Sequence, residues 1–260
     1  MEKKLAQLRK AREILSDKVV VVFSMDIDWA SEYAVSKTLE YFDEQNIPIT
    51  AFLTHHSDVL KNALEEGKIK GGIHPNFMPD SSQGGNFDEV INFCFDLLPD
   101  ARCFRAHRYF DVNDVIDKLA NKGILYESNI CTLLDNVPPF LHRSGMIGFP
   151  IFWEDGGYLY QNGSLNYEDI KEQLYIPGLK VINFHPMHFM LNTPYFTYTR
   201  EIKDRLSRSE WNNLNEESIA KLHYEGQGIT TFIKEMVEDL KKNNVEICYM
   251  DDVYNWICSL

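Results

Sequence analysis

Short apolar runs alternate with amphipathic stretches along most of this 260-residue chain, and this alternation restricts its fold more than any other feature. The first run, KVVVVF at 18–23, is apolar on both faces, which indicates a central strand of a parallel sheet rather than an edge strand. We predict further strands of four to six residues after it. They fall at 48–53, 69–73, 101–104, 124–127, 148–153, 179–184 and 245–249.

Apolar residues at helical spacing occupy the gaps between these strands. An amphipathic helix over 1–17 precedes the first strand. A second helix begins near Ser31 and carries Ala34, Val35 and Phe42 on one face. The other predicted helices cover 58–66, 87–98, 113–122, 229–243 and 251–258.

One domain over 1–260 accounts for this pattern, because a chain of this length can bury most of its apolar surface in a single core. The stretch 128–166 is irregular, apart from the predicted strand at 148–153. The stretch 193–228 is aromatic and then strongly polar, which indicates an insertion or a lid. We therefore predict an α/β fold, a distorted (β/α) barrel with about seven parallel strands and an active site at their C-terminal ends.

Charge and cysteine content argue against several classes of protein. The net charge of −13 disfavours a nucleic-acid binder, which needs a basic face, and disfavours docking on anionic membranes. No segment approaches the ~20 apolar residues of a membrane span, and the N-terminal helix lacks the apolar core of a secretory signal. The five scattered cysteines indicate reduced thiols. Together these features predict a soluble, cytoplasmic protein.

Polar side chains with catalytic chemistry directly follow five of the predicted strands. In a parallel barrel the C-terminal strand ends open on one mouth, so residues far apart in sequence can share one centre. The sequence therefore predicts a single site at these ends. They carry Asp26 with Asp28, His74, Arg105 with His107, Glu154 with Asp155, and His185 with His188.

The aspartate pair after the first strand suggests a metal site. On an extended strand end, Asp26 and Asp28 would point the same way, about 7 Å apart along the chain. Two such carboxylates repel each other unless a cation lies near them, which suggests one metal ligand and one general base. The alternative is that either aspartate caps the helix that begins near Ser31.

Histidines follow two other strands. His74 could be a hydrogen-bonded structural residue, but its place opposite the aspartates favours metal ligation. A histidine with carboxylates suits Zn²⁺, with Fe²⁺, Mn²⁺ and Co²⁺ as alternatives. Either His185 or His188 could protonate a leaving group, because histidine titrates near neutrality. We prefer His185, which directly continues its strand, and leave His188 as a supporting residue.

Two further residues admit two interpretations each. Arg105 either forms a salt bridge that steadies Asp26 or clamps a carboxylate or phosphate of the substrate. Trp153 either forms a wall of the substrate pocket or packs in the core. We expect Trp153 to contact substrate together with Asn76 and His188.

The order of these motifs resembles the polysaccharide deacetylase superfamily, the NodB-homology domain of carbohydrate esterases, and more closely its WbmS-like branch. In that superfamily an aspartate pair is followed by a histidine motif, an arginine motif, an Asp/Trp motif and a strand that ends in histidine. The resemblance covers roughly 18–190. The matching segments are Asp26 with Asp28, GIHPNF at 72–77, FRAH at 104–107, FPIFWED at 149–155 and INFH at 182–185.

The resemblance implies metal-dependent removal of an N- or O-acetyl group from a sugar. A metal-bound water would attack the acetyl carbonyl, and the departing amine would be protonated. The roles that it implies are metal ligation by Asp28 and His74, general base catalysis by Asp26, orientation of the base by Arg105, acid catalysis by His185, and tuning of the acid by Asp155.

One motif departs from the superfamily's pattern. The second motif of the superfamily usually provides two histidines four residues apart, but Met78 stands four residues after His74. A thioether cannot replace a hard ligand of Zn²⁺. His107, at the next strand end, is the first candidate for the third ligand, and the neutral oxygens of Asn76 and Gln83 are weaker candidates.

Two functions from different classes fit this sequence. The ordered motifs favour a hydrolase that removes an acetyl group, held by an amide or ester bond, from a carbohydrate or sugar-derived substrate. The missing histidine motivates the alternative, a non-catalytic carbohydrate-binding or scaffold protein with a degenerate site. The aromatic stretch 194–198 could stack on a sugar ring or form a contact in a homo-oligomer.

Overall fold

The strand β1 (Val19–Asp26) lies inside the sheet of the computed structural model, which describes residues 1–260. Every residue of β1 after Val19 is buried. The strand pairs in parallel with β2 (Ile49–Leu53) on one side and with β9 (Gly178–Phe184) on the other. The first apolar run therefore forms the central parallel strand that its composition predicts.

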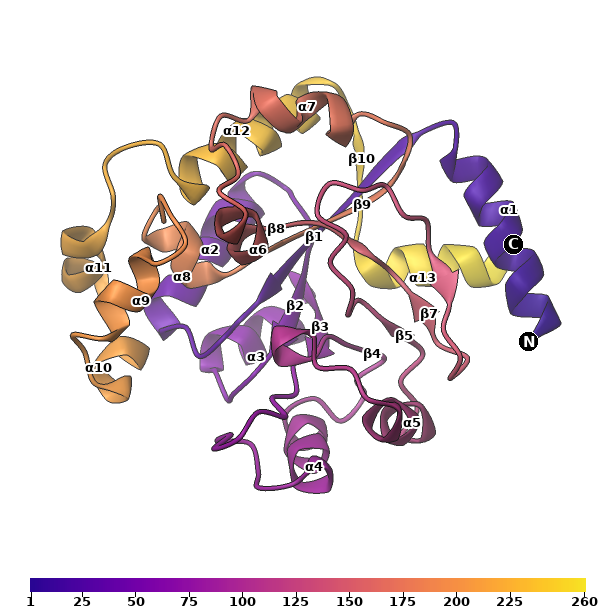
Figure 1. The fold of residues 1–260 in the computed structure, drawn as a ribbon, viewed down its shortest axis with the longest axis horizontal. Coiled ribbons are helices and arrows are strands. Elements are labelled where there is room, and N and C mark those ends of the chain that lie inside the picture. The colour runs from indigo at the N-terminus through magenta and orange to yellow at the C-terminus, as the bar shows by residue number, and fades with distance from the viewer.

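The other strands extend the sheet on both sides of β1 and curl it into the predicted distorted (β/α) barrel (Figure 1). The strand order is β6-β7-β5-β4-β3-β2-β1-β9-β8, and β10 pairs with the first half of β1. Cys131, beyond β5, forms a parallel bridge with Ile151 of β8, so the far edges of the sheet approach each other. The bounds are β3 (Ile69–Ile73), β4 (Cys103–Phe104), β5 (Tyr126–Glu127), β6 (Phe140–Leu141), β7 (Ile147–Gly148), β8 (Ile151–Glu154) and β10 (Glu246–Ile247).

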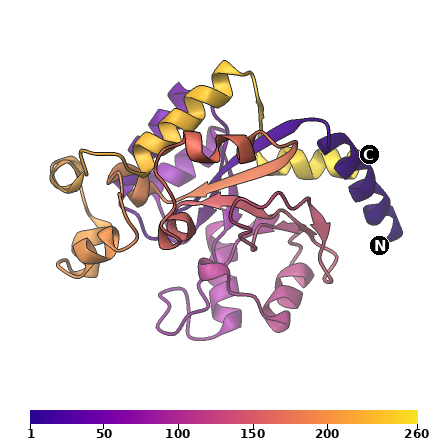
Figure 2. The same ribbon diagram turned by 45° about the horizontal axis from the view of Figure 1, so that its top comes forward.

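Helices surround this sheet, and α1 (Glu2–Leu15) lies beside α13 (Met250–Ser259) where both termini are found (Figures 1 and 2). No helix has the length and the apolar character that a membrane span requires. Most helices follow the predicted ranges, namely α2 (Glu32–Glu44), α3 (Asp58–Glu65), α4 (Phe87–Leu97), α5 (Asn113–Asn121) and α12 (Ile229–Lys242). The short helix α8 (Pro186–Met190) was not predicted.

The sheet has 10 strands rather than about seven, because the stretch predicted to be irregular contains short elements. β6 and β7 form an antiparallel hairpin, with Gly145 at φ +87° in its turn. The predicted strand at 148–153 is divided into β7 and β8 at Pro150, which has no N–H for the ladder. Two helices also follow β8, α6 (Asp155–Tyr160) and α7 (Glu168–Leu174).

The 193–228 segment forms three short helices that project to one side of the sheet (Figure 2). Its two ends meet, because the N–H of Ile229 donates to the carbonyl of Thr193 at 3.1 Å. A Cβ at Gly228 would overlap the carbonyl oxygen of Asn192, so glycine is required there. Ile202, Trp211, Leu214 and Ile219 of this segment belong to the main hydrophobic core. The helices are α9 (Tyr198–Lys203), α10 (Arg208–Asn212) and α11 (Glu216–Leu222).

A buried carboxyl group at the end of β5 makes the stability of the fold depend on pH. Glu127 is 4% exposed, and burial raises its pKa to about 7. In the unfolded chain a glutamate titrates near 4.3. The folded state therefore binds a proton that the unfolded state has lost, and this contribution to stability disappears as the pH rises toward 7 and beyond.

We predict that Glu127→Gln stabilises the protein at alkaline pH and not in acid. The amide keeps an oxygen that can accept the Asn129 N–H but carries no charge, so the gain is on the order of 3 kcal/mol, or roughly 5 °C or more in Tm, at pH 8. Thermal unfolding followed by circular dichroism between pH 5 and 8 measures it. The exposed Glu172→Gln serves as the matched control. A Tm difference that does not grow with pH would contradict the assignment.

Candidate active site

The strand ends bring seven of the sequence-predicted residues to the mouth of the barrel. Each follows directly from a strand that is buried in the sheet, so the backbone fixes where the side chain begins. These residues form two groups. The first contains an aspartate and two histidines, and the second contains a histidine with the carboxylate that it contacts. The residues are Asp26, Asp28, His74, Arg105, His107, Asp155 and His185.

Asp26, the last residue of β1, is held by a buried network across three strands. Its Oδ1 accepts from the guanidinium of Arg105 at 2.9 Å, and its Oδ2 accepts from the side-chain amide of Asn183 on β9 at 2.9 Å. The guanidinium also donates to the amide oxygen of Asn183. Asp26 is 3% exposed, so the network fixes both carboxylate oxygens at the floor of the site.

Arg105 has no exposed surface, which decides between its two interpretations. Besides Asp26, it donates to the hydroxyl of Ser24, and to both the carbonyl and the hydroxyl of Ser128. The guanidinium also lies over the ring of Phe52, at 4.3 Å from its centroid. The side chain steadies Asp26 and is out of reach of a substrate. Asn183 escaped the sequence interpretation, although an amide inside the apolar run 179–184 was a signal for it.

Asp28 does not continue the strand in extended form, and this corrects the predicted geometry of the aspartate pair. Asp28 and Trp29 have φ of 44° and 54°, so the chain turns through the left-handed region directly after β1. Aspartate enters this region more readily than most residues. Neither aspartate caps the next helix, because Ser31 does so by accepting the Ala34 N–H. The turn aims Asp28 across the mouth.

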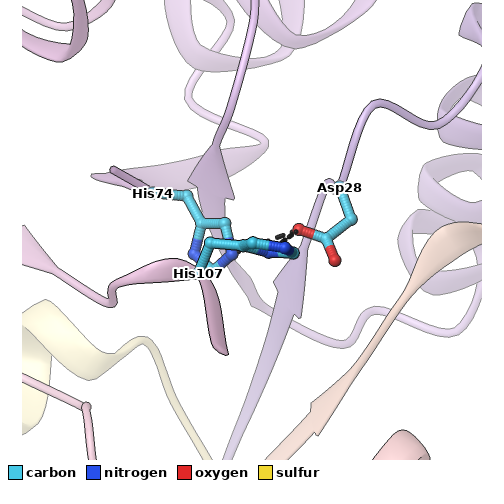
Figure 3. Close-up of side chains that lie close together, drawn as sticks. All are labelled: Asp28, His74 and His107. Carbon is cyan, nitrogen blue, oxygen red and sulfur yellow. Dashed lines mark hydrogen bonds and ion pairs between the residues drawn. The ribbon is translucent and has the colours of Figure 1, made fainter. Parts of the chain in front are cut away.

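Asp28, His74 and His107 converge on one point (Figure 3). The Oδ1 of Asp28 lies 3.0 Å from Nδ1 of His107 and 3.2 Å from Nε2 of His74. Donor atoms around a tetrahedral Zn²⁺ stand roughly 3.3 Å apart, so these separations suit one shared cation. Burial opposes the charge of Asp28, but its hydrogen bonds with His107, His185 and His74 lower its pKa well below the ordinary value. The residues present therefore fit a divalent metal.

His107 supplies the second imidazole of this group, and the oxygens of the weaker candidates are engaged in other hydrogen bonds. The side-chain oxygen of Asn76 accepts the N–H of Met78 at 3.1 Å in a local turn. The oxygen of Gln83 accepts the N–H of Asn76, and its amide donates to the carbonyls of Thr54 and His74. Both oxygens thus serve the loop that supports His74.

His185 faces the same centre from the opposite side. Its Nδ1 lies 2.6 Å from Oδ1 of Asp155, and its backbone N–H donates to Oδ2 of that carboxylate at 2.8 Å. Its Nε2 is 3.5 Å from Oδ2 of Asp28. Burial opposes protonation, but Asp155 and Asp28 raise the pKa of His185 well above its ordinary value. Asp155 therefore fixes the orientation of the imidazole, whose Nε2 is directed to Asp28.

Because of a β-bulge in β8, Glu154 and not Trp153 lies opposite Asn183 of β9. The register with β9 shifts between Ile151 and Trp153, so Trp153 pairs with Ile182 and not with the mouth-facing Asn183. Its ring is fully buried and stacks on Phe232 at 5.2 Å. Trp153 therefore packs in the core and does not form the expected pocket wall.

Glu154 lies opposite Asn183 of β9, at a strand end that the sequence interpretation included in the site without giving Glu154 a role. Burial and the neighbouring Asp155 raise its pKa to about 7. Its carboxylate accepts the N–H groups of Gly156 and Gly157 at the start of α6, so it also fixes the helix that begins with Asp155. The signal was present in the sequence as two adjacent acids after a strand.

His188 lies behind His185, with the two ring centroids 5.4 Å apart. Its Nδ1 is buried and has no hydrogen-bond partner. Burial lowers the pKa of His188 to about 4, so the ring is neutral at physiological pH. It cannot act as the protonated acid there, which agrees with the preference for His185.

Comparison with known proteins gives a family match over most of this region. The family model "WbmS-like: Polysaccharide deacetylase" matches residues 23–202, which is more than half of the chain and includes all seven residues at the mouth. A search of the curated proteins finds no significant match.

Solved structures share the fold at low sequence identity. WbmS of Bordetella bronchiseptica, described as a polysaccharide deacetylase involved in O-antigen biosynthesis, is 22% identical, with 84% of this chain and 90% of that chain covered and a TM-score of 0.74. A family 4 carbohydrate esterase from Bacillus anthracis is 12% identical, with 93% and 84% covered and a TM-score of 0.48. At 22% identity the likeness to WbmS concerns the fold.

We predict that the protein binds one divalent cation and that His107→Ala weakens this binding. Loss of one of three ligands should cost more than the roughly 10- to 100-fold typical of supporting residues. Calorimetric titration of the metal-stripped protein with Zn²⁺ measures the affinity. His56→Ala is the matched control, because His56 also follows a strand but is exposed and lies outside the group. Equal affinities of the two variants would contradict ligation by His107.

Proposed function

Because the chain belongs to the WbmS-like polysaccharide deacetylase family, we propose that it is a metal-dependent hydrolase that removes an acetyl group from a carbohydrate or sugar-derived substrate. The observation that carries this proposal is the placement of Asp26 and His185 on either side of the Asp28, His74 and His107 group. A base and an acid thus flank one candidate metal centre, which is the arrangement that amide or ester hydrolysis needs.

Asp28, His74 and His107 would hold the cation, with Zn²⁺ the best match to one carboxylate and two imidazoles and Fe²⁺, Mn²⁺ or Co²⁺ as alternatives. The metal would supply Lewis acidity toward the acetyl carbonyl and toward water. The chain supports the centre through burial, since His74 is 1% exposed. Asp26 lies next to it, with its Oδ1 3.9 Å from Nδ1 of His74.

In the proposed reaction, Asp26 accepts a proton from the attacking water; its position beside His74 supports this role. As the water oxygen bonds to the acetyl carbon, one of its protons passes to the Asp26 carboxylate. Arg105 and Asn183 hold that carboxylate in place throughout, because neither has room to move in the core. They act as positioning residues. Because they already hold the carboxylate in place, the groups around it need not rearrange during the reaction.

In the proposed reaction, His185 acts as the acid, and its contacts with Asp28 and Asp155 support this role. When the bond from the acetyl carbon to nitrogen or oxygen breaks, Nε2 of His185 gives its proton to the leaving atom, and acetate departs. Asp155 keeps the ring in the required orientation through Nδ1 and the backbone N–H. A protonated His185 is needed, and its raised pKa provides this form at neutral pH.

We predict that Asp26→Asn reduces acetate release by at least about 100-fold, the usual contribution of a general base. The amide cannot accept the proton, although it matches the carboxylate in shape. Release of acetate from N-acetylated and O-acetylated sugars measures activity, and bound metal is quantified in the same samples. Retention of metal together with loss of activity supports the role of a base, whereas unchanged activity would contradict it.

The effect of His185→Gln should depend on the leaving group. Departure of an amine needs a proton, so turnover of an N-acetyl sugar should fall on the order of 100-fold or more. An aryl acetate with an acidic phenol needs little protonation, and its hydrolysis should fall far less. Rates on both substrates, compared with those of His56→Ala, test this prediction. An equal loss on both substrates would assign His185 a structural role.

A further inference from the structure

A small cavity joins the catalytic group to the 193–228 segment. It has a volume of about 70 Å³, room for roughly two water molecules or one small polar group. Asp28, His185 and His188 line it on the barrel side. Thr199, Lys203 and Trp211 line it from the 193–228 segment. A substrate group bound here would lie beside Asp28 and His185.

Lys203 gives this cavity a positive charge that no carboxylate of the protein neutralises through an ion pair. Its ammonium lies over the ring of Trp211, 4.5 Å from the centroid, and Trp211 is 5% exposed. The cation–π contact holds the ammonium in place without cancelling its charge. By contrast, Lys221 on the same segment pairs with Glu217 at 2.6 Å. The chain has a net charge of −13, so an unpaired lysine beside the candidate active site is a local positive charge that is suited to bind an anion.

The other groups around the cavity do not compete for this ammonium. Asp28 is the carboxylate that acts on Lys203, but it already interacts with three imidazoles and would be a metal ligand. His188 is neutral and offers no acceptor charge. Lys203 is exposed to solvent as a residue, so it is accessible to a ligand. The cavity therefore favours a small anion.

We propose that Lys203 is a specificity-determining residue that binds an anionic group of the substrate, so that the preferred substrate is an acidic sugar. This inference rests on the proposed function, from which it takes the reaction. The preference for an anion is argued separately, from Lys203 and the cavity. The anionic group carries oxygen atoms of a carboxylate on the sugar ring or of a phosphate ester. A charge-assisted hydrogen bond from Lys203 and a hydroxyl donor from Thr199 match either one.

The test measures binding of sugars that carry no acetyl group and so cannot be turned over. Glucuronate, glucose 1-phosphate and glucose are titrated into the metal-loaded protein, and the indole N–H resonance of Trp211 reports occupancy by NMR. We expect at least one anion to bind roughly 10-fold or more tightly than glucose, the scale of one charge-assisted hydrogen bond. The tighter anion identifies the source, carboxylate or phosphate.

Variants assign the preference to Lys203. Lys203→Met and Lys203→Gln should abolish the preference for the anion and leave glucose binding unchanged, whereas Lys203→Arg should retain it. Lys221→Met is the matched control on α11 and should behave like the natural protein. Equal binding of the three sugars, or a preference that survives Lys203→Met because the metal binds the anion, would overturn the proposal.

The same samples separate this inference from the proposed function. Acetate release from N-acetylated sugars tests the reaction, and the titrations test the charge preference. An anion preference that depends on Lys203 without any acetate release would reject the deacetylase and keep the anion site. Acetate release without such a preference would keep the deacetylase and reject the site.

Discussion

A guanidinium with no access to water holds the mouth of the barrel together. Arg105 reaches from the end of β4 to Asp26 on β1, Asn183 on β9 and Ser128 beyond β5. A buried charge is tolerated only when it is paired and hydrogen-bonded, so these partners cannot move independently. The interaction fixes the ends of strands that are distant in sequence, and every other functional side chain is placed relative to them.

Asp28 connects the two halves of the site that this framework creates. The left-handed turn after β1 places its carboxylate between His74 and His107 on one side and His185 on the other. Under the proposed function, the first side would bind the cation and His185 on the second side would supply the proton. One short turn would then connect the candidate metal centre to the acid, while Arg105 and Asn183 hold Asp26 in place for its proposed role as the base.

The sequence predicted the parts of this site that depend on local order along the chain. The succession of strands and the candidacy of His107 followed from which residues come directly after apolar runs, whereas Arg105 kept two interpretations until the structure paired it with Asp26. Features set by tertiary contacts were beyond it. The bulge that turns Trp153 toward Phe232 and Glu154 toward the mouth depends on the register with β9, and the place of Lys203 depends on how the 193–228 segment folds back.

Anomalous X-ray diffraction from crystals of the Zn²⁺-loaded protein tests the central claim most directly, because it locates the cation without reference to activity. Our account predicts one peak at roughly 2.0–2.2 Å from donor atoms of Asp28, His74 and His107. Glu154, Asp155 and His185 form the competing group of potential ligands at the same mouth. A peak in that competing group, or none between the first three residues at saturating zinc, would contradict the account.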